Sequence, residues 1–176
     1  MQFGVAPVLV VLASAGLAQS VHAAGFEAIA PLVGKTWVGE DVSEKGERTV
    51  SVEKWEWILG GKAVQVTQSV NSGELGMQYT YFIDPVTHGL SFHAVSTVGP
   101  TSEGTLGMVG GKLVRDEKVI GVAELNEVRN TYNISADGSM TTSSEYYRDG
   151  KSVGGGHEFH YHADPGAKIV FSPVGK

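Results

Sequence analysis

The chain of 176 residues contains no cysteine, so disulfide bonds, thiol chemistry and zinc–thiolate sites are excluded. Lysine and arginine form no cluster, and 13 basic against 19 acidic residues give a formal net charge of −6. This balance argues against binding to nucleic acid or to anionic lipid. The apolar run at residues 5–17 is shorter than the roughly 20 residues that a membrane-spanning helix needs.

The N-terminus has the composition of a secretory signal peptide. Small residues follow the apolar run at 5–17, and Val21-His22-Ala23 fits the small-residue pattern of a cleavage site. We therefore predict a signal peptide over residues 1–23, a mature domain over residues 24–176, and a periplasmic or secreted location. No side chain before Val5 is positively charged, which indicates a weak n-region or a misplaced start codon. The alternative to a signal peptide is a buried N-terminal helix or strand.

From Thr36 onward, short runs rich in Val, Thr, Tyr, Phe and Trp recur about every ten residues, which is typical of β-strands. Turn residues between the runs, such as Asp137-Gly138 and Asp149-Gly150, favour tight hairpins. No long helical period interrupts the series, and only a closed sheet leaves no edge exposed. The sequence therefore predicts an all-β fold, a single antiparallel up-and-down barrel of about ten strands, with a short helix at 25–33 before it. The expected strands span residues 36–42, 48–59, 62–70, 76–84, 90–97, 103–109, 112–120, 126–135, 139–148 and 156–163.

Alternation along the strands assigns side chains to the two faces of the barrel. In the fourth strand Met77, Tyr79, Tyr81 and Ile83 share one side, which we expect to be the interior. The second strand is less regular, because Val50 and Val52 lie on one face whereas Trp55, Trp57 and Leu59 lie on the other. A β-bulge near Glu53-Lys54 would bring both apolar sets to the interior.

Three segments resemble a known class of barrels. The stretch L-V-G-K-T-W-V-G-E at residues 32–40 resembles the first strand of lipocalins and fatty-acid-binding proteins, the calycin barrels, in which a tryptophan closes one end. The segments W-E-W-I-L-G-G-K at 55–62 and Y-F-I-D-P at 81–85 are similar to a group of uncharacterised bacterial calycin-like domains. The resemblance implies the fold and a plugging role for Trp37, and that group brings no established activity.

The six residues H-E-F-H-Y-H at 157–162 hold three histidines. In a strand, the aromatic side with Phe159 and Tyr161 should face the interior, which leaves His160 and His162 on the outer wall. This pair is the candidate for zinc or copper, yet an open wall offers no enclosing shell. We therefore expect a solvated strand face, with no bound metal and no cofactor.

The interior face of the last strands is unusually polar for a structural core. Tyr132, Tyr146, Arg148 and His157 fall on it by alternation. The Tyr146-x-Arg148 pair is similar, in reversed order, to the Arg-x-Tyr pair that holds the ligand carboxylate in fatty-acid-binding proteins. Alternatively, Arg148 lies at the strand end and reaches solvent beside Asp149, or it caps the barrel against Trp37, as the resemblance to lipocalins implies. The candidate ligand-binding residues are Trp55, Trp57, Tyr79, Tyr81, Tyr132, Tyr146, Arg148 and His157.

The leading functional hypothesis is an exported lipocalin-like barrel that binds a small, partly apolar molecule, which can carry a negative charge. The alternatives are a haem- or metal-binding barrel, with His157 as the inward ligand or with the His160/His162 pair, and a filled barrel with a structural or interaction role. We expect no enzymatic activity, since no nucleophile elbow and no paired carboxylates occur. The expected partner is a small-molecule ligand, without a membrane span after cleavage, and the oligomeric state is left open.

Overall fold

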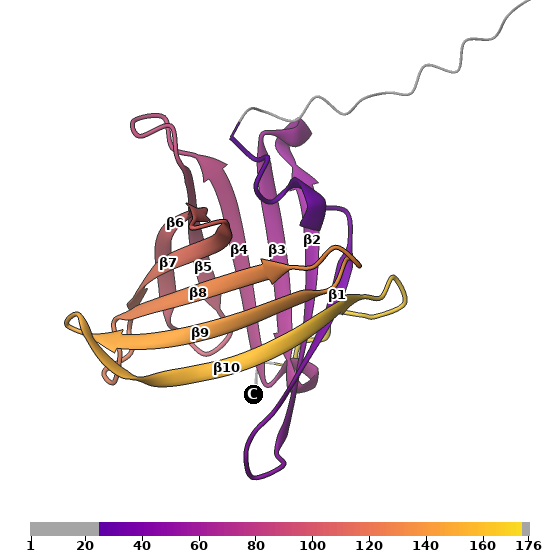
Figure 1. The fold of residues 1–176 in the computed structure, drawn as a ribbon, viewed down its shortest axis with the longest axis vertical. Helices are drawn as coiled ribbons and strands as arrows, with labels where there is room; N and C mark the ends of the chain where they lie inside the picture. The colour runs from indigo at the N-terminus through magenta and orange to yellow at the C-terminus, as the bar shows by residue number, and fades with distance from the viewer. Residues whose placement is uncertain (1–24, 174–176) are drawn as a thin grey trace, which may run out of the picture.

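The computed structural model describes residues 25–173 (Figure 1). The predicted signal peptide and its cleavage site lie outside the described residues. Ten strands form one closed antiparallel barrel in which each strand pairs with its sequence neighbours and β1 pairs with β10. The strands are β1 (Thr36–Val42), β2 (Arg48–Ile58), β3 (Ala63–Val70), β4 (Leu75–Ile83), β5 (Leu90–Ser96), β6 (Thr101–Val109), β7 (Lys112–Ile120), β8 (Glu127–Ile134), β9 (Met140–Arg148) and β10 (Lys151–Ala163).

The predicted fold class is confirmed, and the strand limits, apart from one, coincide with the expected ones or differ from them by one or two residues. Closure between β1 and β10, with Trp37 opposite Ala163, leaves neither strand as a free edge. The helices are single 3-10 turns: η1 (Ala30–Leu32), η2 (Leu59–Gly61) and η3 (Asn71–Gly73). Among the described residues, no helix is long and apolar enough to cross a membrane.

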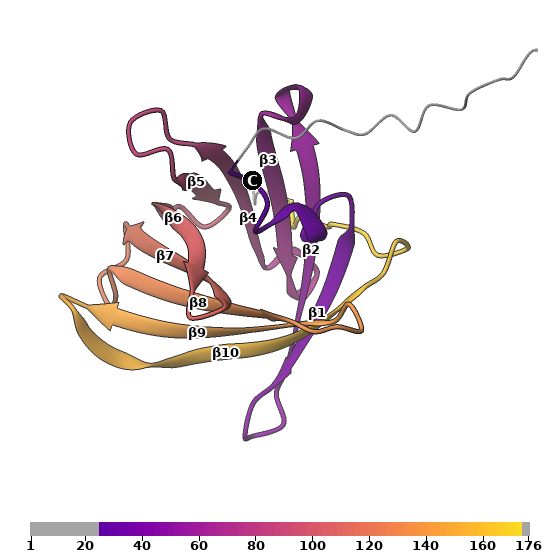
Figure 2. The ribbon, with the colours of Figure 1, turned by 45° about the horizontal axis from the view of Figure 1, so that its top comes forward.

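The largest difference from the expected limits is in β10, which begins at Lys151 rather than at residue 156. Its pairing with β9 slips twice, between Ser152 and Gly154 and between Gly155 and Glu158. Glycines weaken a strand pattern in the sequence, yet they also permit the bulges that let a strand curve. In Figures 1 and 2, β8, β9 and β10 run across the direction of β2, β3 and β4, so that the closed sheet encloses a core between two crossing layers.

The N-terminal segment closes one end of the barrel. Phe26, Ile29 and Leu32 are fully buried, and the side chain of Trp37 is 1% exposed. The Trp37 indole N–H donates to the carbonyl oxygen of Leu32 at 3.1 Å, which ties η1 to the first strand. Trp57 packs edge-on against Phe26, with ring centroids 5.4 Å apart. The prediction that Trp37 is a core plug is confirmed by its burial.

The bulge expected in β2 is absent. The register of β2 runs without a break against both neighbours, from Ser51 opposite Val70 to Ile58 opposite Ala63 on the β3 side. The interior face of β2 therefore carries Ser51 and Glu53 in line with Trp55, and all three are buried. The expectation failed because it assumed an apolar interior, whereas this part of the interior is polar.

Candidate functional site

A cavity of about 400 Å³ lies inside the barrel, at the end opposite η1. Its lining comes from β2, β3, β4, β6, β7, β8, β9 and β10, together with Pro100 and Leu125 from the connections before β6 and β8. The volume is within the range of small-molecule sites, about 300–1,000 Å³. Its walls include the apolar side chains of Val70, Leu75, Met77, Val119, Leu125, Val128 and Phe159.

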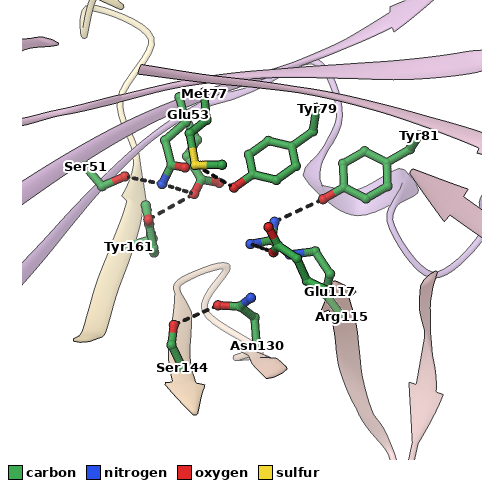
Figure 3. A network of polar contacts seen from close by, with 11 residues as sticks. Ser51, Glu53, Met77, Tyr79, Tyr81, Arg115, Glu117, Asn130, Ser144 and Tyr161 are labelled. Carbon is green, nitrogen blue, oxygen red and sulfur yellow. Dashed lines mark hydrogen bonds and ion pairs between the residues drawn. The ribbon is translucent and has the colours of Figure 1, made fainter. Parts of the chain in front are cut away.

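Arg115 on β7 is the central polar group of this cavity, and its side chain is only 11% exposed. Its Nη1 donates to the hydroxyl of Tyr81 at 3.2 Å, and its guanidinium carbon lies 4.5 Å from the ring centroid of Tyr79 (Figure 3). The aromatic rings hold the cation in place through their negative faces. Arginine keeps its charge in proteins, so Arg115 is a fixed positive charge in the interior.

Glu117, two residues further along β7, neutralises that charge. Its Oε2 lies 3.3 Å from Arg115 Nη2, and its side chain is 6% exposed. Residues i and i+2 of a strand point to the same face, so the two partners enter the interior side by side, as Figure 3 shows. The cavity therefore contains a buried ion pair rather than a lone cation.

Three buried polar atoms along this cavity have no hydrogen-bond partner among the described residues: Ser102 Oγ, Arg115 Nε and Asn130 Nδ2. Asn130 is oriented by Ser144, whose hydroxyl donates to Asn130 Oδ1 at 2.7 Å and leaves the amide N–H groups for another acceptor. Each unsatisfied buried group costs about 1–3 kcal/mol. The three atoms belong to residues of β6, β7 and β8, which are neighbouring strands, and all three residues line this one cavity.

Glu53 lies in the polar part of the core and accepts three hydrogen bonds. Trp55 Nε1 donates to its Oε2 at 3.0 Å, while Gln68 Nε2 and the Tyr161 hydroxyl donate to its Oε1 at 3.1 Å and 3.0 Å. Burial raises the pKa of Glu53, and the hydrogen bond from Trp55, the charge of Arg115 and the bond from Tyr161 oppose the rise. Tyr161 fits here because Gly39 on β1 faces its ring, where any Cβ would collide.

The raised pKa of Glu53 predicts how stability depends on pH. Because the folded protein holds this proton more tightly than the unfolded chain, Glu53 contributes stability that is fully present below its unfolded pKa of about 4.3. That contribution is lost as the pH rises through the folded-state pKa. The free energy of unfolding of the wild type, relative to Glu53→Gln, should therefore fall as urea melts move from pH 4 to higher pH. A difference that grows with pH would mean that the three donors keep Glu53 ionised.

A second acid–base contact lies at the mouth of the cavity. His157 on β10 contacts Asp41 on β1 through its Nδ1, with side chains 50% and 16% exposed. His157 also lines the cavity and packs against Phe159 with ring centroids 5.4 Å apart. It is the only histidine on the interior face within residues 25–173, since the others described there are exposed on the outer wall or in a turn.

The structure separates the predicted site residues into three groups. Tyr79, Tyr146 and His157 line the cavity. Trp55, Tyr81 and Tyr132 are buried in the core outside its lining, and Trp57 lies beside Phe26 at the closed end. Arg148 is exposed next to the β9–β10 hairpin, so the alternative reading of this residue, in which it reaches solvent, is the one observed.

Sequence reasoning missed Ser102, Arg115 and Glu117. A signal for the last two was present, because Leu113, Arg115, Glu117 and Val119 alternate in the seventh strand and Leu113 belongs on the interior face. Because Arg115 and Glu117 are charged, the sequence alone favours a solvent-exposed position for this face of the strand. Their partners come from β4 and from β7 itself, and the Tyr81 contact appears only when the barrel closes.

The assignment of faces in the H-E-F-H-Y-H segment is confirmed. Phe159 and Tyr161 are buried, whereas His160 and His162 are exposed. His160 Nε2 lies 3.4 Å from Glu158 Oε1 with both side chains largely in solvent. Among the described residues, no group of three or more His, Asp or Glu side chains is placed to hold a metal ion.

We therefore predict that these histidines have little effect on stability. His160→Ala and His162→Ala should each change the free energy of unfolding by no more than about 0.5 kcal/mol, as expected for exposed positions. EDTA should leave the melting temperature of the wild type unchanged. If EDTA lowers that temperature by several degrees but has no effect on His160→Ala, the pair does bind a stabilising metal.

A larger hollow of about 700 Å³ lies mainly along the outer wall of β4 to β9. Most of its charged side chains are at least partly exposed, apart from the buried Glu117, and several pair with one another, as Asp116 does with Arg129 at 2.7 Å and Glu103 with Lys118 at 3.7 Å. None of the three unpartnered buried atoms lines it. The interior cavity is thus the better candidate for a specific site.

Comparisons with protein-family models and with curated proteins found no match for this chain. The fold is compatible with the calycin class, because the ten strands close in up-and-down order around one interior. The function of the site is therefore inferred from its own residues.

Proposed function

We propose that this barrel is a binding protein for a small, partly apolar molecule. The ligand would lie in the interior cavity with its apolar body against Met77, Val128 and Phe159. Its polar end would accept hydrogen bonds from Arg115 Nε, Asn130 Nδ2 and Ser102 Oγ. The single observation that carries the proposal is that the three residues with unpartnered buried atoms all line the same cavity.

Three buried polar groups without hydrogen-bond partners in the described part of the chain favour the binding of a ligand that can accept from them. A ligand acceptor placed among the three groups would recover part of the desolvation cost of each. Specific pockets commonly combine apolar walls with a few fixed polar groups of this kind. The proposal is for binding rather than catalysis, and the predicted signal peptide would place it in the periplasm or outside the cell.

Native mass spectrometry of protein purified from its own host tests the proposal. We expect a small-molecule adduct on the wild type that disappears in Val128→Trp, where the larger ring fills the cavity. Val95→Trp is the matched control, because Val95 is 55% exposed on the outer face of β5. An equal adduct on all three proteins, or none on the wild type, would contradict binding in the cavity.

A further inference from the structure

We infer that the buried end of the ligand is an uncharged hydrogen-bond acceptor, such as a ketone, aldehyde or ester carbonyl, rather than a carboxylate. This inference rests on the proposed function and specifies its ligand class. It departs from the sequence-based expectation of a molecule that can carry a negative charge. The charges of the interior side chains favour an uncharged ligand end over a carboxylate.

Within residues 25–173, the two basic side chains that line the cavity, Arg115 and His157, each already contact a carboxylate. Arg115 Nη2 lies 3.3 Å from Glu117 Oε2, and His157 contacts Asp41 at the mouth. Glu53 is a third interior carboxyl group, and its partners are the neutral donors of Trp55, Gln68 and Tyr161. The described lining of the cavity therefore has no cation without a carboxylate beside it, whether Glu53 is protonated or ionised.

An anion in this cavity would have to share Arg115 with Glu117. Two carboxylates on one buried guanidinium leave a net negative charge away from water, which costs several kcal/mol. A carbonyl oxygen avoids that cost because it accepts hydrogen bonds without adding charge. The unpartnered atoms suit it, since Arg115 Nε and Asn130 Nδ2 are N–H donors and Ser102 has a hydroxyl.

An interior arginine without a carboxylate beside it would attract an anionic ligand by its charge. Here Glu117 is 6% exposed and fixed next to Arg115 on the same strand. Glu117 thus acts as the residue that excludes anionic ligands. Removing its charge should invert the preference of the cavity, and this gives a direct test.

The test compares methyl octyl ketone with nonanoate, which have the same alkyl chain and differ by a methyl group in place of a carboxylate oxygen. Isothermal titration calorimetry at neutral pH measures the affinity of each compound for the predicted mature protein, residues 24–176. We expect the wild type to bind the ketone at least about tenfold more tightly than nonanoate. Glu117→Gln keeps an acceptor for Arg115 but removes the negative charge, so nonanoate should become the tighter ligand.

Glu127→Gln is the matched control, because it removes the same charge from an exposed position of β8. Its ratio of affinities should equal that of the wild type. If the wild type binds nonanoate as tightly as the ketone or more tightly, the inference is wrong while cavity binding stands. If neither probe binds the wild type, the proposed function fails, and the inference with it. Should Glu117→Gln not fold, the wild-type ratio alone decides.

Discussion

Replacing Arg115 with methionine should lower the free energy of unfolding by about 3–5 kcal/mol, the cost of breaking a buried ion pair on one side. The mutation removes the only cation that pairs with Glu117 within residues 25–173 and leaves its carboxylate, which is 6% exposed, without that counter-charge. The hydroxyl of Tyr81 also loses the donor that lies 3.2 Å away. Urea melts at neutral pH measure the change.

Two further variants separate the missing charge from the missing side chain. The double variant Arg115→Met, Glu117→Leu should be more stable than Arg115→Met alone, since it leaves no unpaired charge in the core. Arg129→Met is the surface control: Arg129 also pairs with an acid, Asp116, but both side chains are about half exposed. That change should cost no more than about 1 kcal/mol. A loss of similar size for Arg115→Met would show that solvent reaches the interior pair.

Replacing Trp37 with alanine should also cost about 3–5 kcal/mol. The indole is 1% exposed, packs within the core that includes Phe26 and Leu32, and donates a hydrogen bond to the Leu32 carbonyl. Removal of the ring leaves a cavity at the closed end, and that carbonyl loses its donor. A chemical melt that shows a loss under about 1 kcal/mol would contradict the role of Trp37 as a plug.

Trp37→Phe gives the graded control for that experiment. A phenyl ring fills more of the space than a methyl group but cannot donate to Leu32. The free energy of unfolding of Trp37→Phe should therefore fall between that of the wild type and that of Trp37→Ala. The closed end and the interior cavity lie at opposite ends of the barrel. In the ligand titrations, Trp37→Phe should therefore keep the ratio of ketone to nonanoate affinity.

The strands themselves follow from local chemistry that can be read along the chain. Residues such as Met77, Tyr79 and Tyr81 alternate with polar neighbours, and the period of two places them together on the interior face. Glycines at hairpins accept positive φ, as Gly110 and Gly111 do at 57° and 80°. Closure then follows because ten antiparallel strands otherwise leave two open edges.

The polar interior was harder to predict, because what satisfies a buried polar group lies far away in sequence. Glu53 looks like a surface residue until Gln68 from β3 and Tyr161 from β10 supply its hydrogen bonds. The expected bulge in β2 was wrong for this reason. Isolated charged groups do stay on the surface of folded proteins. A charged group can be buried, however, where the fold supplies its hydrogen-bond partners.

By itself, the sequence determined the class of fold, the number of strands and the outward position of His160 and His162, since each depends on alternation and turns within a short segment. The tryptophan plug was implied by the resemblance of residues 32–40 to calycin barrels. Only the tertiary structure decided which arginine is inside. Arg148 and Arg115 both fall on interior-face positions by alternation, but Arg148 ends its strand in solvent, whereas Arg115 lies between aromatic rings of β4 and β8. The cavity, with donors from three neighbouring strands, exists only once the barrel has closed around it.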